Sequence, residues 1–180
     1  MNLPNKITVF RVCMIPLFLI FMLVPGIPAG RIIACVIFSV ACASDFLDGY
    51  LARKNNLVTD FGKFMDPLAD KLLVCSALIC FVSFGIVPAW AVVLIIGREF
   101  IISGFRLVAA DNNIVIAANY WGKIKTVVQM FMCIFFIVDI DSAFMNVVEQ
   151  VFLYAAIALT VISLVDYIYK NRAVISDGIK

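Results

Sequence analysis

Four aspartates lie in places where an apolar stretch would otherwise continue: Asp45, Asp48, Asp66 and Asp70. Spacings of three and four residues place the members of each pair on one face of a helix. Asp45 precedes Arg53, where the first stretch ends, by about 12 Å along a helix axis. A short connection makes two such helices antiparallel neighbours, so all four carboxylates can converge at one depth.

The clustered carboxylates predict a cation site. Four acids this close together cannot all stay ionised unless cations lie between them. Oxygen-only ligand sets suit hard divalent ions such as Mg²⁺ or Mn²⁺. Two alternatives remain open on spacing alone: ion pairing with Arg53, Lys63 and Lys71, or a path for protons or other cations. The chain has no histidine, so a general base must be a carboxylate or a lysine.

Gly49 lies directly after the first pair of acids. Glycine costs a helix about 1 kcal/mol relative to alanine, so its presence needs a reason. Packing of a neighbouring helix is one reason, and close approach of a flat ligand is another. Because two acids and Arg53 lie beside it, we favour a ligand, and Arg53 is placed to bind a phosphate group.

Composition predicts an integral membrane protein. Of 180 residues, 64% are hydrophobic and 14% charged, and the mean hydropathy is +1.10, whereas soluble domains are about half apolar and a quarter charged. The net charge of +2 and the lack of a basic run exclude a nucleic-acid partner. The six cysteines lie in apolar stretches without metal-ligand spacing and are interpreted as small buried side chains.

The expected fold is all-α, with six transmembrane helices in a single domain over residues 1–180. Each apolar segment is near the length of about 20 residues that crosses a bilayer, and only helices satisfy the backbone there. We expect the first segment to be retained rather than cleaved as a signal peptide. The segments are 7–24, 32–53, 67–84, 88–110, 117–138 and 146–168.

Basic residues predict the orientation. The expected outer loops, 25–31, 85–87 and 139–145, contain one basic residue, Arg31, and the other thirteen lie on the opposite side or in the helix halves near it. Cytoplasmic loops carry the excess of lysine and arginine. We therefore expect both termini and the loops at 54–66 and 111–116 to face the cytoplasm.

The core motif at 45–70 resembles the signature of the CDP-alcohol phosphatidyltransferases, with every fixed position matched. The matching residues are Asp45, Asp48, Gly49, Ala52, Arg53, Gly62, Asp66 and Asp70. The resemblance implies that the four aspartates hold two divalent metal ions, Mg²⁺ or Mn²⁺, beside the pyrophosphate of CDP-diacylglycerol. It also implies that Asp70 is the general base and that Gly49, Ala52, Arg53 and Gly62 bind the CDP group. A homodimer in the cytoplasmic membrane of a bacterium, with an active site open to cytoplasm and lipid, follows from the same resemblance.

Residues 2–11, 97–106 and 122–129 resemble the branch of the family whose acceptor is sn-glycerol 3-phosphate and whose product is phosphatidylglycerophosphate. An acceptor phosphate needs fixed cations, and cations are costly in a membrane unless used. The candidates are Arg98, Arg106, Lys123 and Lys125. Alternatively, Arg98 pairs with Glu99, and the other three extend to lipid headgroups.

Two other functions remain as alternatives. One is the same reaction with another acceptor, such as inositol phosphate. The other is a cation transporter, for which we would expect broken helices in paired halves near the midplane. The acids here instead lie in one hairpin near one face, with glycines and an arginine between them, so we favour the enzyme.

Overall fold

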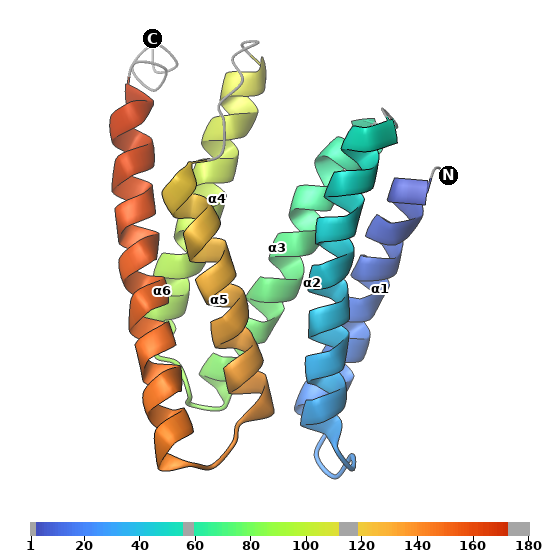
Figure 1. Ribbon diagram of the computed structural model, residues 1–180, viewed down its shortest axis with the longest axis vertical. Coiled ribbons are helices and arrows are strands. Elements are labelled where there is room, and N and C mark those ends of the chain that lie inside the picture. The colour runs from blue at the N-terminus through green and yellow to red at the C-terminus, as the bar shows by residue number, and fades with distance from the viewer. Residues whose placement is uncertain (1–2, 56–59, 112–118, 173–180) are drawn as a thin grey trace. The chain divides into compact units, whose positions relative to one another are not determined.

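The computed structural model describes residues 3–55, 60–111 and 119–172, and side chains there except at 3–8, 45–55, 60–67, 70, 108, 110 and 111. Each of the six predicted segments forms a helix (Figure 1). The helices are α1 Leu3–Leu23, α2 Gly30–Asn55, α3 Asp60–Ser83, α4 Ala89–Asp111, α5 Tyr120–Val138 and α6 Ala143–Lys170. The prediction of an all-α chain is confirmed for the described residues.

The prediction of a loop over 54–66 is wrong. Helix α2 continues to Asn55 and α3 already begins at Asp60. The expected boundaries followed the apolar residues, which give way to polar ones after Arg53 and resume at Pro67. Backbone hydrogen bonding within a helix does not depend on apolar side chains, so both helices extend through polar sequence. All four aspartates consequently lie within helices.

Two compact units divide the chain, and each is described separately. The first comprises residues 1–86 and 133–140. Within it, α1 packs against both α2 and α3 (Figure 1), and the rings of Phe18 and Phe38 meet with centroids 6.0 Å apart. The connection from α1 to α2 is tight, because Gly26 has a φ of +85° and a Cβ at Gly30 would lie 2.9 Å from the Phe21 carbonyl oxygen. Through these contacts α2 and α3, the two helices that carry the aspartates, share α1 as a packing partner.

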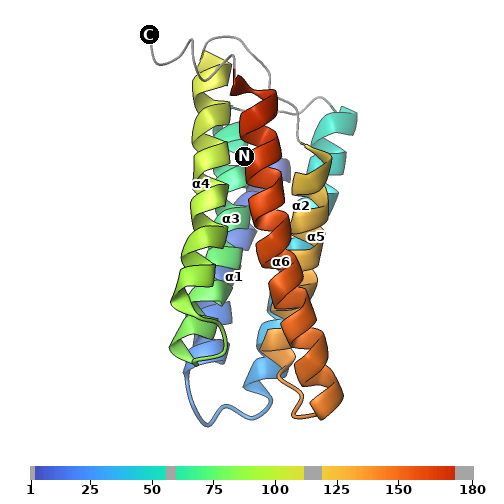
Figure 2. The same ribbon diagram turned by 90° about the vertical axis from the view of Figure 1, so that its left-hand side faces the viewer.

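The second unit comprises residues 87–132 and 141–180. Here α4 packs against α6 (Figure 2), and the rings of Phe131 on α5 and Phe152 on α6 lie 6.4 Å apart. Its interior is unusually polar for an apolar chain. The buried polar and charged residues of this unit are Arg98, Lys125, Gln129, Glu149, Thr160 and Ser163.

Two of the described helices, α5 and α6, are long and apolar enough to cross a membrane by length and composition. Where side chains of the first three helices are described, these helices contain the shorter apolar stretches Val9–Leu23, Gly30–Ser44 and Lys71–Ser83. Large apolar side chains are exposed on several of the described helices, including Val93 on α4 at 70% and Phe144 on α6 at 73%. Such a surface is typical of helices that are covered by lipid or by another protein.

Candidate functional site

The four aspartates occupy matching positions on α2 and α3. Asp45 lies about 15 Å before the end of α2, and Asp70 about 15 Å after the start of α3, at 1.5 Å per residue. Asp48 lies between Asp45 and the end of α2, and Asp66 lies between the start of α3 and Asp70. The two helices contact each other and run antiparallel (Figure 1). Because the four side chains lie outside the described part, their convergence stays a prediction.

The remaining motif residues follow the same helices. Gly49, Ala52 and Arg53 lie on α2, and Gly62 lies on α3; their surroundings also lie outside the described residues. Among the described residues, no group of three or more His, Cys, Asp or Glu could hold a metal ion. The donors that the motif brings to α2 and α3 are carboxylates, which fit a hard divalent cation rather than a soft one.

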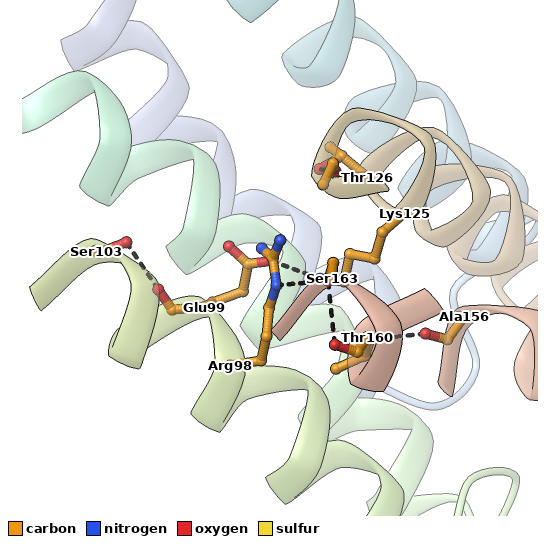
Figure 3. Close-up of polar contacts among 9 residues, drawn as sticks. Arg98, Glu99, Ser103, Lys125, Thr126, Ala156, Thr160 and Ser163 are labelled. Atoms are coloured by element: carbon orange, nitrogen blue, oxygen red, sulfur yellow. Dashed lines mark hydrogen bonds and ion pairs between the residues drawn. The ribbon is translucent and has the colours of Figure 1, made fainter. Parts of the chain in front are cut away.

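A buried polar cluster joins three helices of the second unit (Figure 3). Arg98 on α4 donates from Nε to the Ser163 hydroxyl on α6, at 3.0 Å. It also donates from NH1 to the Glu99 carboxylate at 3.1 Å. Lys125 on α5 donates from Nζ to the same oxygen, Glu99 Oε1, at 2.5 Å. One carboxylate therefore lies between two cations that belong to different helices.

Burial makes this cluster electrostatically important. Arg98 is 7% exposed and Lys125 is 1% exposed. Charges removed from water are costly unless they are paired and hydrogen-bonded. Glu99 supplies such pairing to both cations at once. Removal of that carboxylate would leave two positive charges near each other in a region of low polarity.

The four predicted acceptor-binding cations are only partly brought together. Arg98 and Lys125 share Glu99, whereas Arg106 and Lys123 are exposed and lie outside the cluster. Lys123 and Lys125 are separated because residues two positions apart on a helix do not share a face. The pairing of Arg98 with Glu99, which the sequence left as an alternative, is present.

Two residues in contact with Arg98 had no assigned role in the sequence. Ser163 lies 65 positions from Arg98 along the chain, and serine in an apolar helix commonly bonds its own backbone. Gly122 on α5 is so close that a Cβ there would lie 2.9 Å from Arg98 NH2. The sequence contained one indication of these contacts, Arg98 itself, because an arginine in an apolar helix requires polar partners. It did not identify those partners.

The buried Arg11 was likewise unexpected. It is on α1, the helix that packs against both aspartate-bearing helices, and it is 0% exposed. In the sequence it contributed only to the resemblance of residues 2–11. Its complete burial places a guanidinium inside the unit that contains the core motif.

Known proteins of similar sequence identify the family. The family model described as CDP-alcohol phosphatidyltransferase matches residues 1–162. A CDP-diacylglycerol–glycerol-3-phosphate 3-phosphatidyltransferase of Bacillus subtilis is 51% identical over 140 residues, or 72% of each chain. A probable phosphatidylglycerophosphate synthase of Mycobacterium tuberculosis is 41% identical over 93% of this chain and 80% of its own length. The Haemophilus influenzae CDP-diacylglycerol–glycerol-3-phosphate 3-phosphatidyltransferase is 37% identical over 99% of this chain and 98% of its own. Matches of this extent mean that the chain belongs to the CDP-alcohol phosphatidyltransferase family.

Proposed function

We propose that this chain transfers the phosphatidyl group of CDP-diacylglycerol to sn-glycerol 3-phosphate, forming phosphatidylglycerophosphate and CMP. The observation that carries the proposal is the match, over 99% of the chain, to the Haemophilus influenzae enzyme whose name states this reaction. The buried cations Arg98 and Lys125 add support, because an acceptor that bears a phosphate needs fixed positive charge. A neutral acceptor would have no such need.

The core motif supplies the donor side. The family consists of integral membrane proteins that use divalent metal, and we assign two ions, Mg²⁺ or Mn²⁺, to Asp45, Asp48, Asp66 and Asp70. When bound, such ions would offset charge on the pyrophosphate and on the departing CMP. Gly49, Ala52 and Gly62 leave room for the CDP group, and Arg53 donates hydrogen bonds to its phosphates.

Asp70 activates the acceptor. Its carboxylate takes the proton from an acceptor hydroxyl, and the hydroxyl oxygen attacks the phosphorus next to diacylglycerol. The new phosphorus–oxygen bond forms as the bond to CMP breaks, and CMP leaves with the electron pair. We assign the acceptor phosphate to Arg98 and Lys125, the two predicted cations that share Glu99; Arg106 and Lys123, predicted for the same role, lie outside that cluster.

CMP release tests the reaction and its metal requirement together. Purified protein in detergent, with CDP-diacylglycerol and Mg²⁺ or Mn²⁺, is expected to release CMP with glycerol 3-phosphate and not with inositol, inositol phosphate or serine. Excess chelator should abolish release, because four carboxylates without cations repel one another and the pyrophosphate. Added Mg²⁺ or Mn²⁺ should restore it. Release with a different acceptor would disprove the assigned substrate, and release that persists in chelator would disprove the metal site.

We further propose one membrane domain with six spans, both termini in the cytoplasm and a cytoplasmic active site, assembled as a homodimer in a bacterial cytoplasmic membrane. The asymmetry of basic residues supports the orientation. Arg31, in the first turn of α2, pairs with Asp139 directly after α5, and their side chains are 41% and 47% exposed. This contact agrees with outer loops at 25–31 and 139–145.

Thiol labelling tests the orientation. In a variant without the six native cysteines, Asp141→Cys is expected to react with a membrane-impermeant maleimide added to intact cells. Arg172→Cys, after α6, should react only once the membrane is permeabilised. Both positions are exposed, so accessibility to the reagent should depend on the side of the membrane. The opposite pattern would invert the proposed topology.

A further inference from the structure

Two of the three nitrogens in the guanidinium group of Arg98 are held by hydrogen bonds to described residues, and the third, NH2, is not. Nε donates to Ser163 and NH1 donates to Glu99 (Figure 3). NH2 donates no hydrogen bond to any residue in the part of the chain that the structure describes, and a Cβ built on residue 122 would lie 2.9 Å from it. Because the guanidinium is planar and rigid, fixing two of its nitrogens also fixes the direction of the third.

The Ser163 hydroxyl is itself oriented as an acceptor. Its Oγ donates to the Thr160 carbonyl oxygen at 3.0 Å, so its proton is committed to the α6 backbone. The oxygen lone pairs then remain for the Nε–H of Arg98 at 3.0 Å. Ser163 is 0% exposed, so water does not compete for this bond.

We propose that Ser163 is a positioning residue, which together with Glu99 directs the NH2 group of Arg98 toward the phosphate of the acceptor. This inference rests on the proposed function and adds to it a residue on α6. A long arginine side chain loses considerable rotamer freedom when it binds an anion. If Ser163 and Glu99 have already restricted it, less freedom is lost on binding, and the acceptor binds more tightly.

Gly122 completes this arrangement. A Cβ at this position would lie 2.9 Å from NH2, a separation that forces the guanidinium to move. Glycine at 122 therefore keeps space beside the one edge of Arg98 that remains available. Three helices thus contribute to the position of a single guanidinium: α4 with Arg98 and Glu99, α5 with Gly122, and α6 with Ser163.

Steady-state kinetics in detergent test the proposal. Ser163→Ala is expected to raise KM for glycerol 3-phosphate about tenfold, because a hydrogen bond to a charged group is lost, with KM for CDP-diacylglycerol unchanged. Thr160→Val is the matched control. It also deletes a buried α6 hydroxyl, but among the described residues that hydroxyl bonds only the Ala156 carbonyl oxygen. Ser163→Thr, which retains a hydroxyl, should restore KM, and Gly122→Ala should raise KM for glycerol 3-phosphate as Ser163→Ala does.

The outcomes separate this inference from the function on which it rests. If the wild-type enzyme uses glycerol 3-phosphate but Ser163→Ala behaves as Thr160→Val does, positioning by Ser163 is wrong and the function stands. Equal rises in KM for both substrates would also overturn positioning, because they indicate a general structural effect. A wild-type protein that is folded but inactive with glycerol 3-phosphate would overturn the proposed function, and this inference with it.

Discussion

Asp70→Asn is expected to lower kcat for CMP release by about a thousandfold, since a positioned general base contributes roughly 10²–10⁴. The amide has nearly the same shape as the carboxylate, but it cannot accept the proton of the attacking hydroxyl. It also removes one negative charge from the proposed metal site. The measurement is CMP release from CDP-diacylglycerol and glycerol 3-phosphate at saturating substrate and metal.

The control for this variant is another aspartate changed in the same way. Asp141 is exposed in the connection from α5 to α6, and Asp141→Asn should retain wild-type kcat. Both variants should unfold at the wild-type temperature, so that inactivity is not confused with misfolding. If folded Asp70→Asn keeps more than about a tenth of wild-type kcat, a loss far below that of a missing general base, Asp70 is not the base.

Glu99→Gln is expected to lower the free energy of unfolding by about 2–3 kcal/mol. Removal of one partner from a fully buried ion pair costs about 3–5 kcal/mol, and the exposed fraction of the Glu99 side chain, 20%, reduces this because water screens the charge. The amide leaves Arg98 and Lys125, two buried cations, without the carboxylate they share. Unfolding by heat or denaturant in detergent, with wild-type protein in parallel, measures the change.

Glu149→Gln is a matched control in the same unit. Glu149 is also buried, on α6, but its Oε1 has no hydrogen-bond partner in the part of the chain that the structure describes. Neutralising an acid without such a partner removes a desolvation cost and loses no ion pair. The free energy of unfolding of the Glu149→Gln variant should therefore equal or exceed that of the wild type. Equal stability of the Glu99 and Glu149 variants would mean that the shared carboxylate does not stabilise the fold.

Local sequence properties were enough to predict the six helices. Apolar runs of nearly bilayer length, separated by Pro25 to Pro28, Gly85 to Pro88 and Asp139 to Ser142, correspond to the observed connections. The same approach failed between α2 and α3. Hydropathy locates where a chain becomes polar, whereas a helix ends where its backbone hydrogen bonds end, and these are different places.

The charged residues of the acceptor site illustrate the limit of sequence reasoning. Arg98, Arg106, Lys123 and Lys125 are equally costly in an apolar chain, and hydropathy treats them alike. In the structure, Arg98 and Lys125 are buried around Glu99, while Arg106 and Lys123 are exposed. The rotation of each helix about its axis decides which cation faces inward, and that rotation is set by packing against neighbouring helices.

The sequence by itself determined the helical architecture, the aspartate motif and the family, because each depends on residue types at fixed local spacing. Only the tertiary structure decided that Glu99 joins Arg98 to Lys125, that Ser163 holds Arg98 from another helix, and that Gly122 leaves it room. Contacts between residues as distant as 65 positions depend on the depth and rotation of whole helices. No local pattern of residues encodes those two quantities.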